Sequence, residues 1–318
     1  MPFLLRRLLR SLALLIGVSF LSFLLLDLAP GDYFDTMLLN PQISPATVAA
    51  IRSQYGLNRP LPQEYWSWIR SIGRGDWGYS LAYNLPAAPL IWQRARYTLL
   101  LSGTATALAW IAALALGIWS SARPHSWIAA LVRTLEALLM AIPELVLALS
   151  LLLIAVWSGI APAAGASSSI SALQPRSLLD LARHLLLPCL SLALGLLPLL
   201  LLHVRSSMRQ ALDSPFVNAA RAYGIRPARL LFRHALPVAA NPLISLFGLS
   251  IGLLMSSSLV TETVFSWPGI GSLMVTAILD RDFFVVVDCT LLAAIFLLAG
   301  NFLADLLLFL QDPRVRAS

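Results

Sequence analysis

The chain has 318 residues, of which 58% are hydrophobic and 12% are charged, and its mean hydropathy is +0.80. A soluble core of this length would need more polar surface, so the composition indicates a protein that crosses a membrane several times. All 22 basic residues are arginine, and the formal net charge is +7. The arginines are spread over loops between apolar runs, which favours a role in membrane topology and argues against nucleic acid as a partner.

Six segments are long enough to cross a hydrocarbon layer of about 30 Å as helices that rise about 1.5 Å per residue. They lie at roughly 11–28, 99–119, 135–157, 185–204, 238–260 and 283–310. The first resembles a signal peptide, but its apolar stretch exceeds the ~7–15 residues of a cleaved one, and no A-x-A site follows. We therefore expect it to be retained as a membrane anchor.

The distribution of arginines predicts the orientation of these six spans. With the N-terminus inside, the short inner segments carry thirteen arginines and the short outer loops carry three. The remaining arginines lie in or beside the long segment 30–95, which is translocated largely regardless of charge. The sequence therefore predicts that both termini and the segment 205–237 are cytoplasmic.

The segment 30–95, after the first span, is the only soluble piece of any size. Residues 63–72 are helix-like, and Trp66, Trp68 and Ile69 make an aromatic and apolar surface suited to the lipid interface. A piece of this size with few aliphatic side chains is too small for a stable core of its own. We therefore expect it to pack on the outer ends of the helices.

Two carboxylates lie in the third predicted span. Glu144 follows Pro143, which frees backbone groups and is expected to kink the helix. An ionisable group at this depth is costly, so Glu144 either faces a substrate pathway, where it attracts an ammonium or metal cation, or bonds to a neighbouring helix. Glu136 is expected at a helix interface near Arg133.

The segment 205–237 is a polar island between two apolar runs, with six arginines and a single acid, Asp213. Ser214 and Pro215 fit an N-cap and a first helical position, and Gly224 fits a helix end. A second short helix is expected to open at Pro227 and to stop before the proline that closes the segment. The pattern predicts a helix–turn–helix that stands off the membrane and contacts a soluble protein.

The spacing inside this island resembles the EAA loop of bacterial ABC importer permeases. That loop reads E-A-A, three residues, G, nine residues, I, one residue, L-P. Here Asn218-Ala-Ala-Arg-Ala-Tyr-Gly224 is followed by nine residues, His234, one residue and Leu236-Pro237. Asn218 replaces the Glu and His234 replaces the Ile, and both departures are ordinary for the peptide/nickel branch, with its A-R-A-x-G and R-H-A-L.

Five further motifs resemble the same branch, in the same order, at 28–32, 55–62, 75–81, 262–271 and 312–316. Only 158–180 lacks a counterpart. The resemblance implies an all-α, six-helix type I ABC importer permease fold with a small outer segment after the first helix. It divides the chain into an N-terminal transmembrane helix (1–29), a periplasmic segment (30–95), a five-helix permease core (96–312) that contains the coupling loop (205–237), and a cytoplasmic tail (313–318).

In that family the coupling loop docks in a groove of the ATPase subunit, and Val217 would add apolar contact here. The residues that the resemblance assigns to ATPase coupling are Asn218, Ala219, Ala220, Arg221, Tyr223, Gly224, Leu236 and Pro237. The chain has no G-x-x-x-x-G-K-[ST] loop, so ATP and Mg are expected to bind to separate ATPase subunits, with no cofactor in this chain. The four histidines lack metal-ligand spacing and no catalytic constellation is found, so we assign no metal site and no enzymatic role.

The resemblance implies a permease subunit of the bacterial cytoplasmic (inner) membrane that forms half of a pathway for peptides. Its expected partners are a second homologous permease, two ATPase subunits, a periplasmic or lipid-anchored substrate-binding protein and membrane lipids. Nickel or another small solute is the alternative cargo. A different class, an ATP-independent secondary transporter, predicts inverted repeats, and none is found between residues 1–159 and 160–318.

Overall fold

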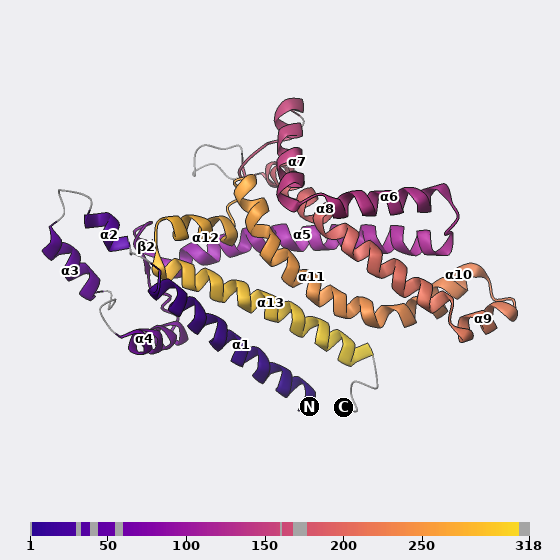
Figure 1. The fold of residues 1–318 in the computed structure, drawn as a ribbon, viewed down its shortest axis with the longest axis horizontal. Helices are drawn as coiled ribbons and strands as arrows, with labels where there is room; N and C mark the ends of the chain where they lie inside the picture. The colour runs from indigo at the N-terminus through magenta and orange to yellow at the C-terminus, as the bar shows by residue number, and fades with distance from the viewer. Residues whose placement is uncertain are drawn as a thin grey trace. The chain divides into compact units, whose positions relative to one another are not determined.

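The computed structural model of the chain describes residues 2–29, 33–38, 44–54, 60–159, 161–167 and 177–311. These residues are mostly helical, which confirms the predicted all-α class (Figure 1). A short antiparallel pair, Tyr79–Ser80 (β1) and Leu85–Pro86 (β2), is the only sheet in this part of the chain. The predicted tail 313–318 and most of the motifs at 28–32, 55–62 and 312–316 lie outside the described residues.

The helices follow one another in the order shown in Figure 1. They are Pro2–Asp27 (α1), Tyr33–Leu38 (α2), Pro45–Gln54 (α3), Leu61–Gly73 (α4), Ala87–Ala122 (α5), Trp127–Ala141 (α6), Glu144–Ser158 (α7), Leu178–Leu212 (α8), Pro215–Ala222 (α9), Pro227–Arg229 (α10), the π-helical Leu230–Ala235 (η1), Leu236–Val264 (α11), Ile270–Leu279 (α12) and Phe283–Gln311 (α13).

Among the described residues, five helical stretches are long and apolar enough to span a membrane, and the number is six if the bent pair α6 and α7 counts as one span. The third predicted span is therefore not one helix. It breaks at Ile142 and Pro143, where the axis turns by 104°. Pro143 has no N–H to donate, and Ile142 adopts the extended conformation that a following proline favours, so the helix ends there instead of kinking.

The described chain separates into two compact units. One is built from Arg6–Thr98 and Pro268–Phe296, and the other mainly from Leu99–Trp267 and the described residues from Leu297 on. The long helices α5 and α13 contribute residues to both.

In the unit that contains α1 and α4, the α4 part of the segment 30–95 packs on helices. Tyr65 and Trp68 of α4 lie against Phe23 of α1, and the indole N–H of Trp68 donates to Asp288 Oδ1 of α13 at 3.0 Å. Trp68 is only 5% exposed, so its predicted place on a lipid-facing surface is wrong. Trp66 does face outward, with the guanidinium of Arg70 over its ring.

In the other unit, α8 packs on α6, α7 and α11. Small residues permit close approach of the helix backbones. A Cβ on Gly117 of α5 would lie 2.6 Å from Val204 of α8, and one on Gly248 of α11 would collide with Ala304 of α13. The indole N–H of Trp110 donates to the hydroxyl of Ser250 at 3.0 Å and so ties α5 to α11.

Candidate functional site

The coupling loop (205–237) begins in the last two turns of α8, which ends at Leu212. Asp213 follows the last residue of α8, Ser214 precedes α9 in an extended conformation, and Pro215 is the first residue of α9, as predicted. The hydroxyl of Ser214 donates to the carbonyl of Ala211 instead of accepting from an N–H of α9. Ser214 therefore stabilises the connection to α8 more than the start of α9.

The end of α9 is a Schellman motif. Gly224 has φ +75°, its N–H donates to Arg221 O, and the N–H of Ile225 donates to Ala220 O. The left-handed conformation confirms the predicted helix-ending role of Gly224, because a residue with a Cβ adopts it at a cost. A Cβ on Gly224 would meet nothing within 4 Å, so the requirement for glycine is one of backbone conformation alone.

The second half of the loop differs from the prediction. A helix does open at Pro227, but it does not stop before Pro237. The chain stays helical through the π-helical η1, in which Leu236 N–H donates to Leu231 O, five residues back, and runs directly into α11. Pro237 has no N–H to donate within this continuous helix, and it lies just after the π-helical turn.

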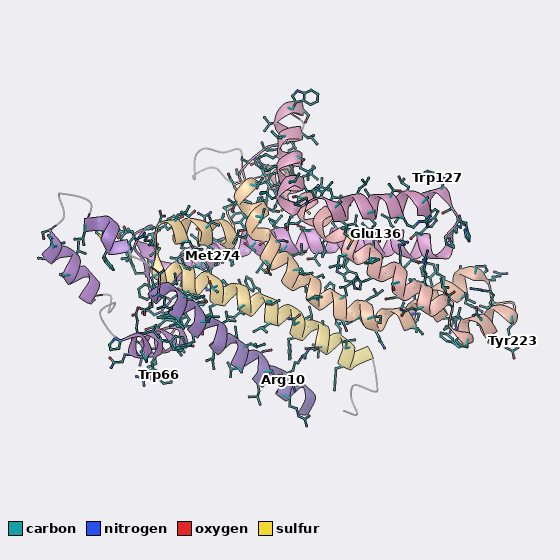
Figure 2. The ribbon with its side chains drawn as sticks, in the orientation of Figure 1. Arg10, Trp66, Trp127, Glu136, Tyr223 and Met274 are labelled. Carbon is teal, nitrogen blue, oxygen red and sulfur yellow. The ribbon has the colours of Figure 1, made fainter. Side chains whose placement is uncertain are left out.

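The residues predicted for ATPase coupling fall into two groups. Six of them lie on α9 and its end, where Ala220 is half-buried and Asn218, Ala219, Arg221, Tyr223 and Gly224 are exposed. Tyr223, 89% exposed, projects at the end of the loop (Figure 2). Leu236 and Pro237 lie instead in the first turn of α11.

Val217 does not belong to the exposed group. It is fully buried, so it supports α9 from inside, and the expectation that it contacts a partner is wrong. The neighbouring Phe216, 46% exposed, offers the apolar surface that was expected of Val217.

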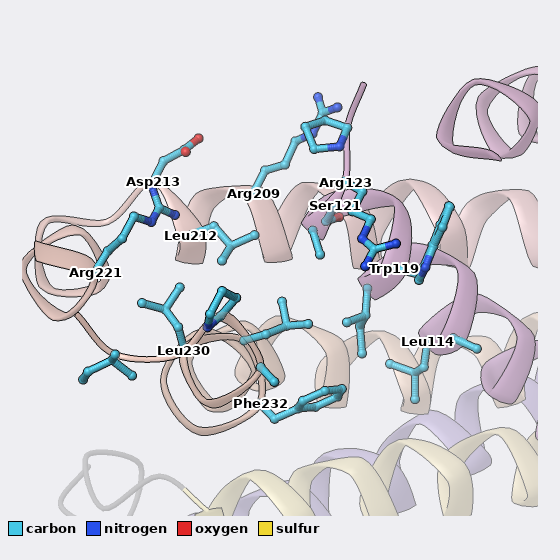
Figure 3. Close-up of a pocket in the computed structure, with 18 residues that line it drawn as sticks. Leu114, Trp119, Ser121, Arg123, Arg209, Leu212, Asp213, Arg221, Leu230 and Phe232 are labelled. Atoms are coloured by element: carbon cyan, nitrogen blue, oxygen red, sulfur yellow. The ribbon is translucent and has the colours of Figure 1, made fainter. Parts of the chain in front are cut away.

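A pocket of about 1050 Å³ lies between the end of α5, the end of α8 and the coupling loop (Figure 3). Its lining is mainly apolar, with the charged side chains of Arg123, Arg209, Arg221 and Asp213 among it. Sequence reasoning missed this pocket, because its walls come from segments about a hundred residues apart and no local pattern connects them.

Glu136 and Glu144 both turn toward α8. Glu136 accepts a hydrogen bond and ion pair from the guanidinium of Arg205, whereas Arg133 donates to the carbonyl of Pro124. Glu136 thus lies at a helix interface, as predicted, and its ion-pair partner there is Arg205. Arg205 lies two turns before the end of α8, so this pair connects α6 to the helix that carries the coupling loop.

Glu144 is the first residue of α7, directly after the break at Pro143. One of its carboxylate oxygens is buried and has no hydrogen-bond partner among the described residues. The hydroxyl of Ser257 on α11 lies within reach of the carboxylate, and Gly195 of α8 lies beside its Cγ. The side chain thus points between α7, α8 and α11.

No group of three His, Cys, Asp or Glu side chains close enough to hold a metal ion is found in the described part of the chain.

The apolar helices and the short arginine-rich helical loop between α8 and α11 define a multi-pass membrane protein. Residues 113–317 match the family described as binding-protein-dependent transport system inner membrane component, and residues 1–90 match the N-terminal region of such membrane components. The chain belongs to this family, which confirms the resemblance read from the coupling loop and its flanking motifs.

Its relatives include both peptide and nickel permeases. The chain is 34% identical to the oligopeptide transport system permease protein AppB of Bacillus subtilis, over 98% of each chain. It is 34% identical to the di/tripeptide transport system permease protein DppB of Pseudomonas aeruginosa, over 96% of this chain and 97% of that one. It is 29% identical to the nickel import system permease protein NikB of Staphylococcus aureus, over 98% and 90%.

Proposed function

We propose that this permease subunit forms half of a translocation pathway for peptides in an ATP-driven importer. A second homologous permease forms the other half, two ATPase subunits drive the cycle, and a periplasmic or lipid-anchored binding protein delivers the substrate. Peptides are favoured over nickel as cargo, because the peptide permeases AppB and DppB are each 34% identical to the chain and the nickel permease NikB is 29% identical.

The observation that carries the coupling role is the exposed face of α9. Ala219 has almost no side chain, so a partner backbone can approach closely, while Tyr223 supplies a large amphipathic contact. Arg221 can pair with carboxylates of the partner. A structural loop with no partner would not need to expose both Phe216 at the start of α9 and Tyr223 after its end.

The coupling loop lies on the cytoplasmic side in this proposal, as the excess of inner arginines favours. ATP and Mg bind to the ATPase subunits, which close on each other and move α9. Through α8 this movement reaches the helices that contact it, and the bundle changes between inward-open and outward-open states. Such coupling requires that the ATPases bind the two states unequally.

We propose in addition that Glu144 acts on the pathway as a carboxylate that attracts cationic groups of the substrate. Its position at the break between α6 and α7 and its unpartnered buried oxygen support this role. A buried carboxylate oxygen without a partner is costly, so a passing ammonium group or water would stabilise it.

The test is reconstitution of the tagged chain with its genomic neighbours. We expect an ATPase and a second permease to co-purify, and we expect peptide uptake into liposomes to require ATP and the binding protein. A chain that purifies alone and transports without ATP would instead be a secondary transporter. Uptake of nickel but not of peptides, with the same ATP dependence, would leave the machinery intact and overturn the cargo.

A further inference from the structure

The pocket beside the coupling loop has apolar walls that no described residue fills. Leu114 and Ile118 of α5, Leu212 of α8, and Leu231 and Phe232 of η1 contribute to its lining. A volume of about 1050 Å³ is ample for part of an acyl chain as well as a headgroup. Apolar surface of this extent is costly in contact with water, so an occupant with an apolar portion fits it.

The charged residues of the pocket are predominantly basic. Arg123 follows the end of α5, Arg209 lies in the last turn of α8, and Arg221 comes from α9, against a single acid, Asp213 (Figure 3). Arg123 and Arg209 are exposed, and neither forms an ion pair with any residue that the structure describes. The net charge of the lining is therefore +2, which complements an anion.

The pocket lies where membrane spans end. The apolar helices α5 and α8 both finish at it, and its lining includes Trp119, a residue type that is enriched at membrane–water interfaces. This step rests on the proposed function, whose membrane orientation places this interface on the cytoplasmic side. Basic pockets between transmembrane helices on that side are suited to anionic lipid headgroups.

We propose that this pocket binds one anionic phospholipid of the cytoplasmic leaflet. Its phosphate pairs with Arg123 and Arg209, and part of an acyl chain lies against the leucine and phenylalanine side chains of the lining. Free phosphate would leave these apolar walls uncovered, and a zwitterionic lipid would bring its own cation to the two arginines. An anionic lipid matches both halves of the pocket.

Binding at this place has a consequence for coupling. The coupling loop supplies one wall of the pocket, while α5 and α8 supply the others. A lipid that contacts all three stabilises the arrangement of the loop in which the pocket is formed, and it shifts the population toward that arrangement. Anionic lipid is thus expected to change the ATP-driven uptake rate without any contact to substrate.

The test uses the whole transporter, purified with its ATPase and second permease, and offers it phosphatidylglycerol or phosphatidylcholine during native mass spectrometry. We expect retained phosphatidylglycerol, and an affinity about 30-fold lower in the variant R123Q/R209Q, since each arginine near a membrane surface contributes ~1 kcal/mol. The matched control R6Q/R10Q removes two exposed arginines at the start of α1, outside the pocket, and should retain the lipid.

Two further variants separate binding from folding. R123K/R209K keeps both point charges and should retain much of the affinity, whereas A228W keeps all charges but fills the apolar part of the pocket and should lower it. Equal retention of both lipids, or equal loss in R6Q/R10Q, would overturn the proposal. Phosphatidylglycerol displaced by glycerol phosphate alone would show that an anion site, not a lipid site, is present.

This outcome is distinguishable from failure of the proposed function. If the subunits assemble and transport depends on ATP, while phosphatidylglycerol is not retained and does not change the uptake rate, only the lipid site is refuted. If no ATPase co-purifies, the proposed function itself fails, whatever lipid is bound.

Discussion

Gly224 is the residue on which the geometry of the coupling loop depends most directly. Its φ of +75° ends α9 and turns the chain toward Pro227. In Gly224→Val a β-branched residue must adopt this conformation at a cost of roughly 1–2 kcal/mol, which corresponds to about tenfold in the population of the native turn. We expect uptake per ATP hydrolysed to fall by about that factor in proteoliposomes, while ATPase activity persists.

The matched control is Gly224→Asn, because asparagine tolerates the left-handed conformation. Since the space around Gly224 is open, neither substitution should cause a clash. Equal uptake in the valine and asparagine variants would contradict a coupling role for this turn.

Glu144 allows a test of charge at constant shape. Glu144→Gln keeps the volume and one carbonyl oxygen but removes the negative charge at the break between α6 and α7. If the carboxylate attracts cationic groups, uptake of lysine- or arginine-containing peptides should fall several-fold, with little change for neutral and acidic peptides. An equal loss for all three peptide classes would indicate a packing role between α7, α8 and α11.

Asp282, between α12 and α13, predicts a dependence of stability on pH. Burial raises the pKa of this carboxyl group, against the hydrogen bonds that it accepts from Ser80 Oγ at 2.6 Å and Ala82 N at 3.1 Å. The folded state therefore binds a proton at higher pH than the unfolded state does. The contribution of Asp282 to the stability of the folded state is therefore present at low pH. It is lost as the pH rises from the ordinary pKa of the carboxyl group to its raised pKa.

The variant Asp282→Asn keeps an acceptor oxygen for both donors and cannot ionise. We expect thermal unfolding in detergent to depend less on pH above the ordinary carboxyl pKa than in the parent chain. An unchanged pH profile would exclude Asp282 as the group responsible.

At the scale of elements, the pair Glu136–Arg205 fixes α6 on α8. Both side chains are only 11–12% exposed, so loss of one partner leaves a charge that is largely withdrawn from water. We expect E136R or R205E alone to destabilise the protein by about 3 kcal/mol, with much of the loss recovered in the double variant. Melting temperatures of the two single variants and the double variant form the cycle, and additive losses would contradict a direct pair.

The same pair shows where reasoning from sequence stops. Local chemistry was sufficient for Gly224 and Pro227, because helix ends are determined by the few residues that form them. It placed Glu136 at a helix interface but was insufficient to find its partner Arg205, which is 69 residues away. Pro143 predicted a bend, but the 104° turn also depends on how α6 and α7 each pack on α8.

The tryptophans of α4 also show the difference between what local sequence predicts and what depends on distant contacts. Trp66 and Trp68 of α4 are two residues apart, and the spacing of Tyr65, Trp68, Ile69 and Ile72 favours Trp68 for the buried apolar face. The sequence does not show that Asp288 of α13, 220 residues further on, accepts its N–H. Composition predicted a helical membrane protein correctly, whereas the contacts between distant segments required the folded chain.

At the scale of the whole molecule, the orientation in the membrane can be tested by labelling. Cys189 and Cys289 are buried and form no disulfide, so serine at both positions gives a background with no cysteine. Tyr223 at the end of the coupling loop is 89% exposed, and Leu279 at the end of α12 is 77% exposed, so a single cysteine at either is accessible to water-soluble maleimide. The excess of arginine in the predicted inner segments places these two residues on opposite sides.

In intact spheroplasts, which expose only the outer face, we expect Leu279→Cys to react and Tyr223→Cys to remain unlabelled. In inverted vesicles the pattern should reverse, and detergent should make both react. The unsubstituted serine background controls for non-specific reaction. Labelling of Tyr223→Cys from outside would show that the orientation is opposite to the predicted one. In that orientation α9 could not reach a cytoplasmic ATPase, and the pocket of Arg123 and Arg209 could not reach the cytoplasmic leaflet.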